Sequence, residues 1–161
     1  MLEKNKVKVL NKIKFCVLII IIGLIISGIT AFPIQTELKE LSKLDLGFLN
    51  AWIKTVYQSV RSTNVAYPWL AYGTDWFAFA HILLAILFYG PLKNPVKNVW
   101  VIDFGIISCI GIIPLALIAE SIREIPFYWQ LVDCSFGLLA IIPLLYVKRL
   151  IGLLLKPTKS C

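Results

Sequence analysis

The chain has 161 residues, of which 59% are hydrophobic and only 16% are charged, and its mean hydropathy is +0.84. Soluble domains are nearer half apolar with about a quarter of their residues charged, so these values exclude an ordinary soluble protein. The net charge of +7 does not indicate a nucleic-acid-binding protein, because Lys and Arg collect at the ends of apolar stretches rather than on one soluble face.

Four stretches are long enough to cross a bilayer, which takes ~20 apolar residues. They are residues 15–34, 73–92, 99–119 and 127–147, and none contains Lys or Arg. Helices are expected, because open strands would leave backbone polar groups unpaired in lipid. The predicted fold is therefore all-α: one polytopic membrane domain over residues 1–161 with four transmembrane helices.

The first apolar stretch follows a basic tail, residues 1–14, as the core of a signal peptide would. Its apolar run is longer than the ~7–15 residues typical of such a core, and no convincing small-residue cleavage pattern follows it. We expect a retained membrane helix, with a cleaved signal peptide as the alternative.

The segment of residues 35–72 is predicted to be an amphipathic helix outside the bilayer. Thr36 is the expected N-cap, and Leu and aromatic residues recur at helical spacing after it. Gly47 is a point at which this helix divides in two, and residues 67–73 are predicted to form a loop with aromatic side chains at headgroup depth. The segment either lies on the lipid surface or packs as a lid on the helix bundle.

Basic residues predict the orientation. Eleven of the 16 Lys and Arg residues lie in the tail before the first span, in the loop between spans two and three, and in the tail of residues 148–161. By the positive-inside rule both termini are cytoplasmic, and residues 35–72 lie on the opposite side of the membrane.

Polar residues within the spans mark the candidate site. Asp75 begins the second span at its outer edge, and His81, the only His, lies about 9 Å deeper and roughly 240° further round the helix. His81 therefore needs a partner from another span, and Asp133 in the fourth span is expected at a similar depth.

Glu120, Arg123 and Asp133 complete the set, because the third span ends near the level at which Asp133 lies. With Asp75 and His81 they are predicted to form an outward-facing polar pocket, in which His81 and Asp133 are the candidate catalytic pair. The alternatives are a structural hydrogen bond between helices and an interfacial ion pair between Glu120 and Arg123.

Two further features are expected on the third and fourth spans. Asp103 enters from the cytoplasmic side, and we expect it to pair with Lys97 or Lys93, or with the region of Ser108 of a neighbour. Pro114 and Pro143 are expected to kink their helices, because proline removes a backbone hydrogen bond.

The sequence lacks the residue sets expected of several common cofactor, metal and catalytic sites. One His does not supply a haem or zinc ligand set, and the four Cys form no CxxC pair, so no cofactor, metal or disulfide framework is expected. Ser135 lies too close to Asp133 on one helix to favour a Ser–His–Asp triad.

Two patterns resemble a group of small uncharacterised bacterial multi-pass membrane proteins: "AYGTDWFAFAHI" at 71–82 and "IREIPFYWQLVDCSFG" at 122–137. The resemblance implies a bacterial inner membrane and brings no activity. A looser resemblance is to the VanZ-like family of teicoplanin resistance. Asp75, His81, Glu120, Asp133 and Gly137 occur along the chain in the same order as that family's characteristic residues. The chain departs from that family in its longer Asp–His spacing, in Trp76 where the family has Lys, and in Arg123 where it has Gln.

These observations favour a non-catalytic envelope accessory or interaction protein. The alternatives are a small membrane enzyme acting on a lipid-linked substrate through His81 and Asp133, and an oligomeric conduit. The expected partners are membrane lipids, with another membrane protein or a second copy of the chain as alternatives, and no nucleic acid.

Overall fold

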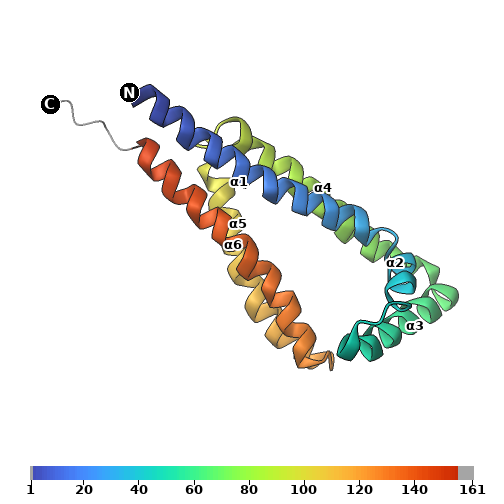
Figure 1. The fold of residues 1–161 in the computed structure, drawn as a ribbon. Helices are drawn as coiled ribbons and strands as arrows, with labels where there is room; N and C mark the ends of the chain where they lie inside the picture. Colours follow the sequence, from blue (N-terminus) through green and yellow to red (C-terminus); the bar gives the residue numbers. More distant parts are fainter. Residues whose placement is uncertain (1, 156–161) are drawn as a thin grey trace. The chain divides into compact units, whose positions relative to one another are not determined.

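The computed structural model describes residues 2–155 and contains only helices in that range. The α-helices, shown in Figure 1, are α1 (Leu2–Ala31), α2 (Ile34–Leu41), α3 (Asn50–Ala66), α4 (Ala71–Lys93), α5 (Val99–Leu115) and α6 (Phe127–Leu155). Three short turns join them: the 3-10 turns η1 (Gly47–Leu49) and η2 (Pro68–Leu70), and the π-helical turn η3 (Ala116–Glu120).

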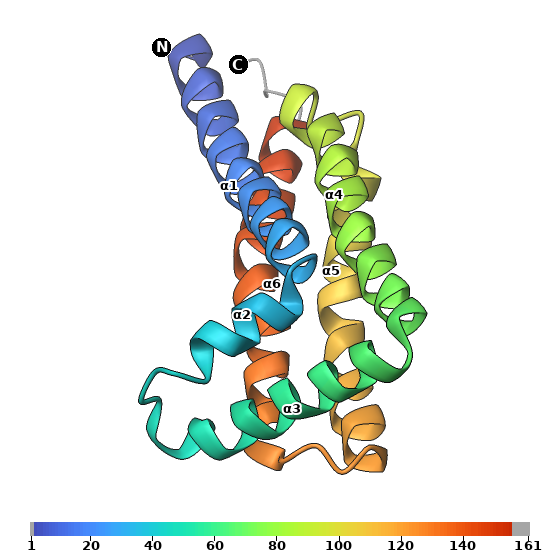
Figure 2. The same ribbon diagram turned by 90° about the vertical axis from the view of Figure 1, so that its right-hand side faces the viewer.

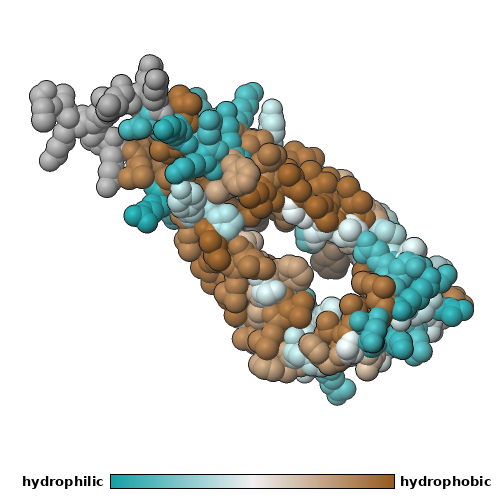
Figure 3. Space-filling model, viewed as in Figure 1, coloured by the Kyte–Doolittle hydropathy of each residue, from teal (hydrophilic) through white to brown (hydrophobic). Residues whose placement is uncertain are grey.

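Four helical segments are long and apolar enough to cross a membrane: Asn5–Ala31, Pro68–Lys93, Val99–Glu120 and Phe127–Leu155. Only 17% to 33% of their most apolar windows is buried, so most of these side chains face outward. Hydrophobic atoms accordingly cover these helices in Figure 3, and hydrophilic atoms gather over α2 and α3. The all-α prediction with four spans is confirmed, and the chain has the make-up of a multi-pass membrane protein.

The helices are longer than the hydropathy limits predicted for them. α1 begins at Leu2 rather than at residue 15, and α6 continues to Leu155 rather than ending near residue 147. The added turns are rich in Lys, Arg and Leu, which are good helix formers, so the helix continues where the apolar stretch ends.

The described chain divides into two compact units. Among the described residues, unit 1 comprises residues 2–21 and 86–155, and unit 2 comprises Ile22–Ala85. The divisions fall within α1 and α4, so each of these helices contributes to both units.

In unit 1, α5 and α6 lie side by side as an antiparallel pair. Glycine allows this approach, because a Cβ atom at Gly137 would lie 2.7 Å from the Cys109 carbonyl oxygen. A Cβ at Gly105 would lie 2.8 Å from the ring of Phe88 and 3.1 Å from Leu144. Gly105 and Gly137 therefore allow close packing of the neighbouring helices.

The turn between α5 and α6 has an unusual geometry. Pro114 cannot donate a backbone hydrogen bond, and the helix passes into the π-helical turn η3 two residues later. Glu124 then has a positive φ of 59°, with backbone bonds from Glu124 N to Ser121 O and from Ile125 N to Glu120 O. These are the bonds of a Schellman motif, which closes the end of the helix. Pro143, by contrast, does not interrupt α6.

In unit 2, the second half of α1 touches the first half of α4. A Cβ at Gly28 would lie 2.8 Å from the Ala78 carbonyl oxygen, and Ala78 is fully buried. This contact holds the end of α1 beside the start of α4, which is the arrangement on which the site in unit 2 depends.

The predicted amphipathic segment is two helices, α2 and α3, visible in Figure 2 as separate rods. Gly47 divides them as expected, with a φ of +60° that suits glycine. The prediction of Thr36 as N-cap is wrong. α2 begins at Ile34, and the amides of Thr36 and Glu37 bond to the Pro33 carbonyl instead. Because the helix begins two residues earlier than expected, Thr36 lies within its first turn and not at the position before it.

Candidate functional site

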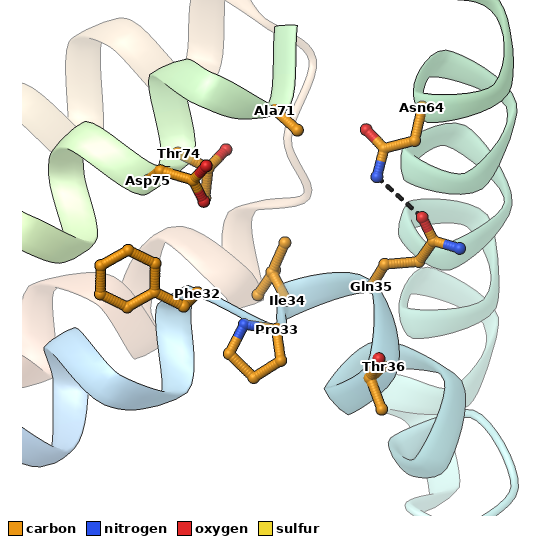
Figure 4. Close-up of a pocket in the computed structure, with 9 residues that line it drawn as sticks. All are labelled: Phe32, Pro33, Ile34, Gln35, Thr36, Asn64, Ala71, Thr74 and Asp75. Carbon is orange, nitrogen blue, oxygen red and sulfur yellow. Dashed lines mark hydrogen bonds between the residues drawn. The ribbon is translucent and has the colours of Figure 1, made fainter. Parts of the chain in front are cut away.

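Each unit contains a group of polar side chains. In unit 2, a pocket of about 340 Å³ lies between the end of α1, the start of α2, the end of α3 and the start of α4. We name it the Asp75 pocket, and Figure 4 shows the side chains that line it: Phe32, Pro33, Ile34, Gln35, Thr36, Asn64, Ala71, Thr74 and Asp75. Its volume is at the lower end of the range of small-molecule sites, ~300–1,000 Å³.

One hydrogen bond organises the wall of this pocket. The Asn64 amide nitrogen donates to the Gln35 side-chain oxygen at 2.7 Å, joining two residues 29 positions apart. Figure 4 shows Asp75 and Thr74 on the opposite wall, from α4, and the ring of Phe32 beside them. Asp75 is half-buried, and it forms no hydrogen bond or ion pair with residues 2–155. The predicted site residue Asp75 therefore does line a pocket.

His81 lies further along α4 and does not line the Asp75 pocket. Its Nδ1 is 2.8 Å from the Phe77 carbonyl oxygen of the same helix. Since a carbonyl only accepts, this bond requires the proton on Nδ1 and leaves Nε2 as an acceptor. His81 belongs to unit 2 and Asp133 to unit 1, so the pairing of these two residues stays a prediction.

In unit 1, Glu120 and Asp133 meet across the α5–α6 turn. The two side chains influence each other electrostatically. The Glu120 Oε2 atom is buried and has no hydrogen-bond partner among the described residues. A hydrogen bond between two carboxyl groups requires a proton on one of them. We name this contact the acidic pair. The sequence predicts both residues at one level, and in the structure they lie close enough to interact.

A buried amide, that of Gln130, and the neighbouring hydroxyl of Ser121 lie beside the acidic pair. Gln130 is only 4% exposed, and its side-chain nitrogen donates to the Ile125 carbonyl at 2.9 Å. Ser121 donates to the Leu117 carbonyl at 2.7 Å and also lies 3.3 Å from the Gln130 side-chain oxygen. These bonds hold the start of α6 against the end of η3, and so they determine where Asp133 meets Glu120.

Arg123 is separate from the acidic pair. It is exposed and lines a shallow depression of about 550 Å³ with Ala119 and Ile122. The alternative of an ion pair between Glu120 and Arg123 is not observed, since the ion pairs among the described residues are Lys43–Glu40 and Lys148–Asp103. The helix turn directs Glu120 toward α6, whereas Arg123 is on the outer side of the turn.

The predicted partner of Asp103 is wrong. Its Oδ1 atom lies 2.7 Å from Lys148 Nζ on α6, not against Lys97 or Lys93. The same oxygen receives no hydrogen bond of good geometry, so the contact is an ion pair and not a directional hydrogen bond. Ser108 instead donates to the Phe104 carbonyl of its own helix. Ser135 likewise donates to the Val132 carbonyl, at 2.5 Å.

The described residues contain no group of three His, Cys, Asp or Glu side chains arranged to hold a metal ion. Cys16, Cys109 and Cys134 are free thiols, and Cys161 lies outside the described residues. No family model matches the chain, and neither a curated protein nor a solved structure shows a significant similarity to it. The resemblances to bacterial membrane families therefore stay predictions.

Sequence reasoning missed most of the Asp75 pocket. Gln35, Asn64 and Thr74 come from three segments, and only folding brings them together. A usable signal was present in the sequence, because polar Gln35 and Thr36 directly follow an apolar span and Thr74 directly precedes Asp75.

Proposed function

We propose that the protein is a non-catalytic accessory or interaction protein of a bacterial inner membrane, which binds an envelope component in the Asp75 pocket. The observation that carries the proposal is the pocket itself: a cavity of about 340 Å³ whose one charged residue, Asp75, has no partner within the described chain. An unpaired, half-buried carboxylate costs desolvation energy, which a bound ligand offsets.

The proposed topology places this pocket on the outer side of the membrane. Both termini are cytoplasmic by the positive-inside rule, so α2 and α3 lie outside and the pocket opens where α1 ends and α4 begins. A component of the outer leaflet or of the adjoining envelope then reaches the pocket without crossing the bilayer. The order of site residues along the chain, which resembles that of the VanZ-like family, is compatible with binding an envelope component.

A second candidate function is a small membrane enzyme that acts on a lipid-linked substrate through His81 and Asp133. One observation favours it: the bond from Nδ1 to the Phe77 carbonyl leaves Nε2 free to accept a proton, as a general base must. An enzyme requires that His81→Gln abolish turnover by a protein that still accumulates. An accessory protein requires that His81→Gln leave the binding of its partner intact.

Photo-crosslinking tests the proposed function. A photoreactive amino acid at Thr36, in the pocket, is expected to capture an envelope component in cells, and Asp75→Asn is expected to reduce the yield. The matched control is the same amino acid at Ser59, which is exposed on α3 and does not line the pocket. Identical products at both positions, unaffected by Asp75→Asn, would contradict the proposal.

A further inference from the structure

The charge of the Asp75 pocket selects its ligand. Asp75 is the only charged residue among the nine that line the pocket, and no Lys, Arg or His is among them. The pocket therefore favours a cation over an anion or a neutral sugar, since an opposite charge stabilises the ionised carboxylate.

The other polar groups distinguish between kinds of cation. The bond from Asn64 to Gln35 uses the Asn64 nitrogen, and in Figure 4 the Asn64 oxygen points away from Gln35, on the side of α4. The Thr36 and Thr74 hydroxyls add acceptor lone pairs. A primary ammonium group has three N–H donors for such acceptors, whereas a quaternary ammonium has none. The ring of Phe32 adds a face that attracts either cation.

The position of the pocket matches the headgroup layer of a bilayer. The candidate spans end at Ala31 and begin at Pro68, and the pocket lies between those two ends. Aromatic side chains, which concentrate at membrane interfaces, are exposed along the start of α4 and just before it: Tyr67, Trp69, Tyr72 and Trp76. A headgroup at this depth reaches Asp75 while its acyl chains stay in the membrane.

From these observations we infer that the Asp75 pocket binds a primary ammonium group, carried by an aminophospholipid headgroup or by a small free amine. Asp75 forms the ion pair, Asn64 and the two threonines accept hydrogen bonds, and Phe32 covers one face. The inference rests on the proposed function, because it names the ligand chemistry of the same pocket.

Lipid retention by the full-length protein tests the inference. The protein is equilibrated with vesicles of phosphatidylethanolamine, phosphatidylcholine and phosphatidylglycerol in equal amounts, and the lipids retained after purification in mild detergent are quantified by mass spectrometry. Wild type is expected to enrich phosphatidylethanolamine roughly tenfold over phosphatidylcholine, and Asp75→Asn is expected to abolish the enrichment. Glu37→Gln, which removes a carboxylate that does not line the pocket, is expected to behave as wild type.

A second arm separates the two sources of the ammonium group. Soluble phosphoethanolamine that displaces the retained lipid indicates that the headgroup alone suffices, and failure to displace it indicates a membrane lipid as the ligand. If the Asp75→Asn protein does not accumulate, the Asn64→Leu variant replaces it in the lipid-retention experiment. This variant removes an acceptor and keeps the charge, so it is expected to reduce the preference for phosphatidylethanolamine over phosphatidylcholine.

Equal retention of the three lipids by wild type, with no displacement by the amine, would overturn the inference. So would enrichment that persists in Asp75→Asn. In either case an Asp75-dependent crosslink at Thr36 to a molecule without a primary amine would leave the proposed function standing. Loss of that crosslink as well would contradict both the inferred ligand and the proposed function.

Discussion

Lys148 Nζ lies 2.7 Å from Asp103 Oδ1, and this ion pair joins α6 to α5 within unit 1. The two side chains are 53% and 40% exposed, so the surrounding solvent screens their attraction. Asp103 is the one carboxylate of α5, and it lies near the predicted cytoplasmic side. Lys148 pairs with it there, where an unpaired charge next to the apolar core would be costly.

Lys148→Met is therefore expected to lower the free energy of unfolding by no more than about 1 kcal/mol. A double-mutant cycle with Asp103→Asn, measured by unfolding in mixed detergent, is expected to show coupling of this size. The control is Lys97→Met, which removes the basic residue that sequence alone favoured as partner. Coupling of Asp103 to Lys97 and not to Lys148 would contradict the structure.

Gly137 and Gly152 lie on the same helix, and we expect substitution by alanine to have opposite effects at the two positions. Gly137→Ala places a methyl group 2.7 Å from the Cys109 carbonyl oxygen, so we expect destabilisation of about 1–3 kcal/mol. A Cβ atom at Gly152 would have no neighbouring atom within 4 Å, so Gly152→Ala is expected to stabilise the helix by up to about 1 kcal/mol. Thermal unfolding in detergent measures both. Equal effects of the two substitutions would show that the α5–α6 contact is not as close as described.

Glu124 has a left-handed backbone conformation, with φ at 59°, in which any residue other than glycine is strained. Glu124→Gly is expected to raise the free energy of unfolding by about 1 kcal/mol relative to Glu124→Ala. Both variants lose the same charge, so their difference isolates the backbone effect. An alanine variant as stable as the glycine variant would argue against the Schellman motif at this turn.

The acidic pair predicts that Glu120→Gln is tolerated, because the amide group donates to the Asp133 carboxylate without needing a shared proton. Glu120→Ala leaves Asp133 without that partner and is expected to cost about 0.6 kcal/mol, the average for hydrogen bonds between membrane helices, and at most about 1.7 kcal/mol. Unfolding in mixed detergent compares the two variants. Equal losses for Gln and Ala would show that no hydrogen bond joins Glu120 to Asp133.

The helices could be predicted from sequence because their signal is local. Runs of apolar residues marked four spans, and Gly47 marked the division between α2 and α3. The ends of α1 and α6 could not be placed by hydropathy, since a helix continues into water as long as its residues favour it.

The partners of polar residues were harder to predict, because they depend on contacts between distant segments. Lys97 is close to Asp103 in sequence, yet Lys148 on the neighbouring helix is the residue that reaches it. Glu120 and Asp133 could be matched by depth alone, since a short turn brings the ends of α5 and α6 together. No such rule links Asn64 to Gln35.

The proposed function depends most on the Asp75 pocket opening to the outside of the cell. Thiol labelling of intact cells with a membrane-impermeant maleimide tests this directly, in a chain whose four cysteines are replaced by alanine. Thr36→Cys, exposed at the pocket, is expected to react in intact cells, whereas Asn94→Cys, exposed in the loop between α4 and α5, is expected to react only after permeabilisation. The reverse pattern, with Asn94→Cys labelled from outside and Thr36→Cys protected, would contradict the central claim.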